Sequence, residues 1–144
     1  MAILVAGTGE VTWPSEVIPP DDELYMRIHR TYYLNPPLPY SEIPPGAFRE
    51  QQGAMSTDWS KYSTPEQTRN RCESPEDNAV IALTVRDVEA IAGLSVRHTP
   101  DWPRGNRAHT DVQGIKAGDK SEVTRRRLAL ARKAGSPRIE LEPL

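Results

Sequence analysis

The sequence has little cysteine, little phenylalanine and no long apolar run. Its 144 residues include one Cys, one Phe and three His. A single cysteine excludes an internal disulfide framework and indicates a reducing compartment. No apolar run approaches the roughly 20 residues that a transmembrane helix needs, and residues 1–6 are too short and lack the basic start of a signal peptide. We therefore expect a cytoplasmic protein that does not contact a membrane.

Proline is plentiful, and it is concentrated in the first third of the chain. Eight of the 14 prolines lie within residues 14–45. Each one fixes φ and lacks an N–H donor, so this stretch is expected to be extended or irregular. The length fits one domain. We expect an extended arm over residues 1–22, an α+β domain over residues 23–135 and a tail over residues 136–144.

Charge is distributed unevenly along the chain. Residues 1–96 hold 7 Lys/Arg against 14 Asp/Glu, whereas residues 97–138 hold 11 Lys/Arg against 4 Asp/Glu. The net charge of the whole chain is only −2. Such asymmetry indicates either an internal match between the two parts or an anionic partner for the basic part.

A strand is predicted near the start of the domain, where aliphatic and polar or aromatic residues alternate. The alternating sets are Leu24, Met26 and Ile28 on one side and Tyr25, Arg27 and His29 on the other. A period of two places Arg27 and His29 on one face, opposite the aliphatic face.

The first helix is predicted from its start signals. Thr64 suits the N-cap, Pro65 the first helical position, and Gln67 completes a capping box. The helix is expected to be about two turns long and to end near Arg71.

A β-α-β unit follows. The apolar run 79–83 is typical of a central, fully buried strand. Thr84 with Asp87 predicts a second helix start, and Gly93 suits the left-handed position that ends that helix. Residues 94–98 are expected to form the next strand.

The last part of the domain is predicted to contain a strand over residues 109–115 and a helix over residues 121–134. The apolar stripe of this helix is imperfect, and its members are Val123, Leu128, Leu130 and Ala131. Together these patterns predict a single α+β domain, with a small mixed sheet of four to five strands and two or three helices.

Several short motifs resemble those of a family of small uncharacterised bacterial proteins. The motifs are Arg27-Ile28-His29, Phe48, Met55-Ser56-Thr57-Asp58, Thr64-Pro65-Glu66 and Asn106-Arg107-Ala108-His109. Arg30 stands where the family is expected to have a proline. The resemblance covers residues 24–134 and implies an organisation but no activity.

Three candidate functional residues lie at or near strand ends in the first half. Arg27 offers a fixed guanidinium fork for a phosphate or carboxylate, and His29 titrates near neutrality. Ser56 could present a hydroxyl to a bound nucleotide, or it could bond its own backbone in a turn. The alternative for Arg27 and His29 is a solvated strand face.

His109 is the fourth candidate. If its segment is a strand, His109 and Asp111 share a face, and the imidazole could act as a general base that the carboxylate orients. The alternative is a satisfied structural pair. The three histidines show no ligand-type spacing, so we expect no metal site, and we expect no cofactor.

A basic set in the last third could form a phosphate-binding face. Its main members are Arg107, Lys116, Arg125, Arg126 and Arg132. Arg125-Arg126-Arg127 spreads over three directions of a helix, so a merely solvated face is the alternative. No zinc-finger, P-loop, nucleophile-elbow or zincin motif is present.

Three functions are therefore considered. The first is a non-enzymatic accessory subunit of a bacterial multi-component system, which contacts a protein partner through the proline-rich arm and the basic helix. The second is a small enzyme acting on a nucleotide or RNA phosphate, for example by ADP-ribosyl transfer. The third is nucleic-acid binding through the basic third.

Two geometric criteria separate the first two functions. The enzyme requires Arg27, His29, Ser56 and His109 to surround one pocket. The accessory subunit requires residues 10–46 to lie exposed or against another chain, and an arm wrapped on its own core would count against it.

Overall fold

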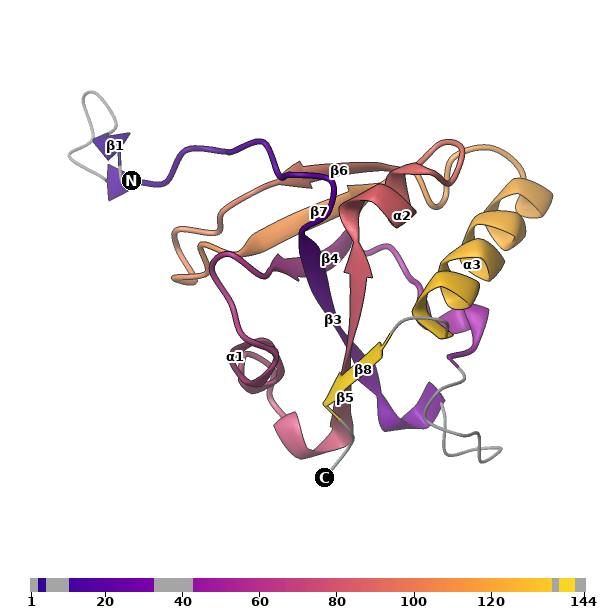
Figure 1. Ribbon diagram of the computed structural model, residues 1–144, viewed down its shortest axis with the longest axis horizontal. Coiled ribbons are helices and arrows are strands. Elements are labelled where there is room, and N and C mark those ends of the chain that lie inside the picture. The colour runs from indigo at the N-terminus through magenta and orange to yellow at the C-terminus, as the bar shows by residue number, and fades with distance from the viewer. Residues whose placement is uncertain (1–2, 5–10, 33–42, 136–137, 142–144) are drawn as a thin grey trace.

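The computed structural model describes residues 3–4, 11–32, 43–135 and 138–141 (Figure 1). Its centre is a six-stranded sheet in the order β6-β7-β4-β3-β5-β8, and every neighbouring pair is antiparallel. The strands of this sheet are β3 (Glu23–His29), β4 (Met55–Trp59), β5 (Asn78–Thr84), β6 (Ser95–His98), β7 (His109–Gln113) and β8 (Arg138–Leu141). Two short strands, β1 (Ile3–Leu4) and β2 (Val11–Thr12), pair separately.

Three α-helices and three short 3-10 helices complete the fold. The α-helices are α1 (Pro65–Asn70), α2 (Val85–Glu89) and α3 (Lys120–Gly135). The 3-10 helices are η1 (Arg30–Tyr32), η2 (Pro45–Ala47) and η3 (Pro75–Asp77). The predicted α+β class and the single small domain are confirmed. Within the described residues, no helix has the length and apolar character needed to cross a bilayer.

The alternation in β3 produces the two faces that the sequence predicts. Leu24, Met26 and Ile28 are buried, while Arg27 and His29 are only partly covered. The aliphatic face joins a core that also contains Leu130 of α3 and Val88 of α2. These two helices therefore cover the core face of the sheet.

The opposite face of the sheet carries α1, and this helix explains why β5 is apolar throughout. Ile81 and Leu83 face the core with Leu24. Val80 pairs with Arg27 and so lies on the other face, where it is fully buried and where α1 contacts both β3 and β5. A strand covered on both faces requires a continuous apolar run.

The local helix signals are confirmed. Thr64 accepts a hydrogen bond from the backbone N–H of Gln67, the Gln67 side chain accepts one from Thr64 N–H, and Pro65 begins α1. Thr84 caps α2 by accepting from Asp87 N–H at 3.1 Å. Gly93 has a φ of +91°, the left-handed conformation expected for it.

The sheet differs from the prediction in two respects. It has six strands, not four to five, because residues 55–59 and 138–141 also form strands. It is antiparallel and not mixed.

The expected β-α-β unit is not formed by neighbouring strands. Strands β5 and β6 point the same way, but β7, β4 and β3 lie between them in the sheet. The five-residue α2 packs on both strands, which requires the sheet to curl; Figure 1 shows β6 and β7 running across the direction of β5.

The expected C-terminal tail is wrong for residues 138–141. These residues form β8, which pairs with β5 at the end of the sheet. The alternation of Ile139 and Leu141 with charged residues is a strand signal, but four residues beyond a helix-ending glycine are too few to distinguish an edge strand from a tail.

Arm residues 13–22 lie on the domain. Ile18 is buried in the core. Ser15 donates to the His98 carbonyl, and the backbone N–H of Glu16 donates to His98 Nδ1 at 3.0 Å. Trp13 packs edge-to-face on Trp102, with ring centroids 4.6 Å apart. Residues 13–22 therefore belong to the folded unit, and residues 33–42 of the proline-rich stretch lie outside the described residues.

Candidate functional site

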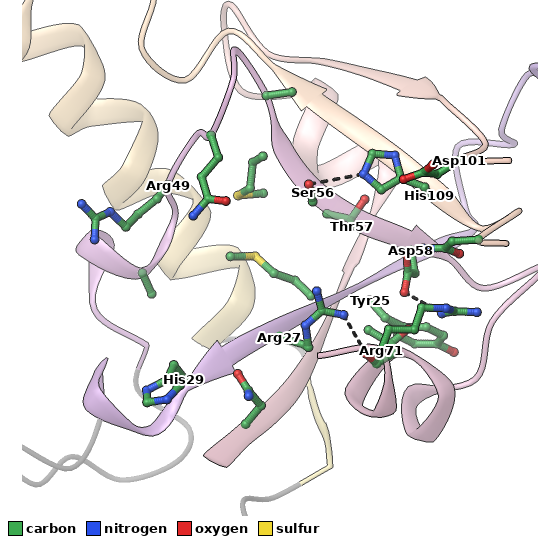
Figure 2. A pocket seen from close by; sticks show the side chains of 18 of the residues that line it. Tyr25, Arg27, His29, Arg49, Ser56, Thr57, Asp58, Arg71, Asp101 and His109 are labelled. Carbon is green, nitrogen blue, oxygen red and sulfur yellow. Dashed lines mark hydrogen bonds and ion pairs between the residues drawn. The ribbon is translucent and has the colours of Figure 1, made fainter. Parts of the chain in front are cut away.

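A pocket of about 550 Å³ opens on the face of the sheet that α1 only partly covers. Arg27, His29, Ser56 and His109 all line it (Figure 2). The sequence placed these residues in three separate motifs, one of which holds both Arg27 and His29, and the antiparallel order β7-β4-β3 brings the motifs together. Residues 101–106 and 47–55 contribute further lining. The first geometric criterion for an enzyme is thus met.

Strand alternation decides which side chains enter the pocket. Tyr25 of β3 pairs with Asp58 of β4, and Asp58 pairs with His109 of β7. Ser56, two residues before Asp58, therefore shares this face and is exposed. Met55 points the other way and is buried in the core.

His109 is held in a defined orientation. Its Nδ1 lies 3.0 Å from the Thr99 carbonyl oxygen. The Thr99 hydroxyl, which can donate or accept, lies 2.9 Å from the same nitrogen. In the tautomer with the proton on Nδ1, that proton is donated to the carbonyl oxygen. The lone pair of Nε2 then faces the Ser56 hydroxyl at 3.3 Å. Asp111 Oδ1 lies 3.9 Å from the same Nε2.

Arg27 lies in the interior of the pocket. Its Nη1 donates to the Thr68 carbonyl of α1 at 2.7 Å. This bond fixes the guanidinium while its remaining N–H groups can serve a ligand, since no other hydrogen bond of Arg27 is observed among the described residues. Figure 2 shows Arg27, in this view, between the Ser56–His109 pair and His29.

His29 lies at the edge of the pocket, and its Nδ1 is already hydrogen-bonded to Thr31, two residues along the chain. Its Nδ1 accepts from the backbone N–H of Thr31 at 3.2 Å and lies 3.1 Å from the Thr31 hydroxyl. His29 lines the pocket with Arg27 but makes no contact with His109.

A buried carboxylate holds the pocket walls together. Asp58, 4% exposed, accepts from Arg71 Nη1 at 2.7 Å and from Asn106 Nδ2 at 2.9 Å. It therefore joins the end of α1 to the loop before β7. The sequence marked Asp58 only as part of a polar strand end. Arg71 and Asn106 were not among the candidate site residues, because their convergence on Asp58 depends on tertiary structure.

The pocket has an excess of positive charge. Its lining includes four arginines and two aspartates, Arg27, Arg49, Arg71, Arg104, Asp58 and Asp101. Each aspartate is paired with an arginine of the lining, Asp58 with Arg71 and Asp101 with Arg104. Arg27 and Arg49 are therefore not neutralised by a lining carboxylate, and the site favours an anion.

The basic residues proposed as a phosphate-binding face are separated. Arg126 is only 6% exposed and donates to the carbonyls of Ala92, Ile115 and Ala117. It is a structural residue, not a surface contact.

Arg107 lies over the Tyr62 ring at 4.3 Å and near Glu16. Lys116, Arg125 and Arg132 are exposed, and none of them lines the pocket. These five basic residues therefore do not converge on the site, although Arg104, another basic residue of the last third, lines it.

Among the described residues, no group of three or more His, Cys, Asp or Glu is arranged to hold a metal ion. Cys72 is half-buried beyond the end of α1, where its thiol donates to the Arg69 carbonyl.

Comparison with protein-family models, with curated proteins and with solved structures finds no significant match to this chain.

Proposed function

We propose that this chain is a small enzyme that binds a nucleotide or RNA phosphate in the pocket. The observation that carries the proposal is the arrangement of Arg27, Ser56 and His109 on three adjacent strands around one cavity. The volume of about 550 Å³ suits a nucleotide-sized ligand. The surplus positive charge suits its phosphate.

Arg27 is the proposed phosphate clamp. Its guanidinium is fixed on one side by the Thr68 carbonyl, so it loses little freedom when it binds an anion. A planar fork can engage two phosphate oxygens at once. His109 is the proposed proton-transfer group, since its Nε2 faces the cavity.

The accessory-subunit function has less support. It depends on an arm that is free to dock, and the described arm residues Ser15, Glu16 and Ile18 are engaged with their own domain. An arm that is bound to its own domain has fewer backbone hydrogen-bonding groups left for a partner protein. The pocket therefore supports the enzyme best.

The proposal is tested by titrating the isotope-labelled full chain with adenosine 5′-monophosphate, inorganic phosphate and adenosine, and following backbone amide shifts. We expect saturable shifts around β3, β4 and β7 with the two phosphates, and weaker binding of adenosine. Arg27→Gln should reduce phosphate affinity about tenfold or more, because a charge-assisted hydrogen bond contributes roughly 1.5–3 kcal/mol.

Arg125→Gln is the matched control, since Arg125 is an exposed arginine outside the pocket. It should bind as the wild type does. An absence of saturable shifts would contradict the proposal. If a short RNA instead binds through Arg125 and is insensitive to Arg27→Gln, the chain is a nucleic-acid-binding protein of the third kind considered above.

A further inference from the structure

The geometry points to Ser56 as a nucleophile that takes up a phosphoryl group, with His109 as its general base. This inference rests on the proposed function and assigns a covalent role within the same pocket. The simpler role for Ser56 is to hold a phosphate or ribose by a hydrogen bond. Three observations favour the nucleophile.

The first observation is the accessibility of the Ser56 hydroxyl. Ser56 is exposed on the pocket face, and the only hydrogen-bond partner of its hydroxyl among the described residues is His109. The next residue of β4 shows the contrast. Thr57 is 3% exposed, and its hydroxyl donates to the Thr110 carbonyl. The Thr57 hydroxyl is therefore committed to the sheet, whereas that of Ser56 is available to react.

The second observation is the order of groups from Ser56 outward. The Ser56 hydroxyl lies 3.3 Å from His109 Nε2, and His109 Nδ1 lies 3.0 Å from the Thr99 carbonyl oxygen and 2.9 Å from the Thr99 hydroxyl. In the tautomer that the inference uses, Nδ1 carries the proton and donates it to the carbonyl, and Nε2 is free to act as the base. A nucleophile, a base and a group that orients the base form the arrangement of an activated serine. The 3.3 Å separation is somewhat longer than an ideal bond, as is common without substrate.

The third observation is the placement of charge. When His109 takes the serine proton, it becomes an imidazolium, and Asp111 Oδ1 at 3.9 Å from Nε2 favours that cation. Arg27 lines the same pocket and lies, in the view of Figure 2, between the Ser56–His109 pair and His29. Its guanidinium is suited to the negative charge that develops on the phosphoryl oxygens.

The step balances without any further reactant. Ser56 Oγ attacks phosphorus and forms an O–P bond while the bond from phosphorus to the leaving oxygen breaks. The serine proton moves to His109 Nε2 and is delivered to the leaving alcohol or phosphate. The products are a phosphorylated Ser56, a protonated leaving group and neutral His109. Water or an acceptor hydroxyl, activated by the same imidazole, then takes the phosphoryl group from Ser56.

A fluorophosphonate probe tests the inference without knowledge of the substrate. Its phosphorus accepts the serine oxygen and loses fluoride, so an activated serine is labelled covalently. We expect one label per full-length wild-type chain, located on Ser56 by peptide mass spectrometry, and slower labelling in the presence of adenosine 5′-monophosphate. Ser56→Ala should abolish the label. His109→Gln should slow labelling by about 100-fold or more.

Ser121→Ala is the control, because Ser121 is an exposed serine on α3 outside the pocket; it should label as the wild type does. Thermal melting of each variant verifies folding, and protection of the wild type by the monophosphate needs no variant at all.

The outcomes separate the inference from the proposed function. Monophosphate binding without any label on Ser56 would overturn the nucleophile and leave the phosphate pocket intact. Undiminished labelling of a folded His109→Gln variant would overturn the assignment of His109 as the general base. A label on Ser56 without monophosphate binding or protection would overturn both the phosphoryl substrate and the proposed function.

Discussion

Two adjacent arginines on α3 have opposite environments. Arg125 is exposed, whereas Arg126 is buried and donates to three backbone carbonyls in the segments before β6 and α3. Glu122, one helical turn earlier, lies 3.2 Å from Arg126 Nη2. Successive helix residues point about 100° apart, since a turn contains 3.6 residues. The second arginine therefore stabilises the domain, although the sequence made both look like surface charge.

This contrast gives a stability prediction. Arg126→Met should lower the free energy of unfolding by about 2–4 kcal/mol, because it leaves buried carbonyls without a donor and Glu122 without its partner. Arg125→Gln should change the same quantity by less than about 0.5 kcal/mol. Urea denaturation of both variants measures the difference. Equal small effects would show that Arg126 is not a structural residue.

At the scale of elements, the arm is held by a neutral histidine. His98 accepts from Glu16 N–H at Nδ1, so its Nε2 carries the proton and donates to the Arg107 carbonyl at 2.7 Å. Burial lowers the pKa of His98 below 6.5. Protonation would place a second proton on Nδ1, where it opposes the Glu16 N–H. The hydrogen bond from Glu16 N–H to His98 therefore forms only while His98 is neutral.

Glu16 adds a second, charged anchor. It accepts from Lys61 at 2.7 Å and from the Tyr62 hydroxyl at 2.5 Å. These two hydrogen bonds lower its pKa from 4.5 to about 2. Because Arg107 lies near Glu16 and directly follows Asn106, which bonds Asp58, the arm also supports the loop that lines the pocket.

Acid should therefore loosen the arm in two steps. The contribution of His98 is complete above pH 6.5, the value for the unfolded chain, and is lost as the pH falls through the lowered folded value. The contribution of Glu16 is complete above about 4.5 and is lost as the pH falls toward 2. Urea denaturation between pH 8 and pH 3 should show both losses.

Glu16→Gln is the matched variant for the lower step, because it keeps the shape and removes the charge. It should reduce stability at pH 7 and abolish the loss near the acid end, while it preserves the step that His98 produces. An imidazole NMR titration that places the His98 pKa above 6.5 would contradict the proposed neutral anchor.

At the scale of the whole molecule, one sheet separates the core from the pocket. The core face packs on α2 and α3, and the opposite face is shared between α1 and the cavity. The pocket residues come from both halves of the sequence, from β3 and β4 in the first half and from β7 in the second. A ligand bound there contacts segments that unfolding would separate.

Ligand binding should accordingly stabilise the entire fold. At a free monophosphate concentration of 100 times the dissociation constant, the free energy of unfolding should rise by about 2.7 kcal/mol. Thermal melting in adenosine 5′-monophosphate measures this shift. Arg27→Gln should lose most of the shift, and Arg125→Gln should retain it. A similar shift in both variants would place the bound phosphate outside the pocket.

Much of the local structure was determined by the sequence alone. The period of two in β3, the caps at Thr64 and Thr84 and the left-handed Gly93 are properties of neighbouring residues, and all of them are found in the structure. Short-range sterics and hydrogen bonding settle such features before any tertiary contact forms. The same alternation placed Arg27 and His29 on one face.

Only the tertiary structure decided which of these local features meet. The order β7-β4-β3 brings Ser56 to His109 across 53 residues, and the antiparallel curl of the sheet replaced the expected mixed arrangement. The burial of Arg126 and the pairing of residues 138–141 with β5 were likewise invisible in the sequence. The physical reason is common to all four. Strand order, strand edges and buried charges depend on contacts between distant segments, and no local pattern encodes a partner that lies far along the chain.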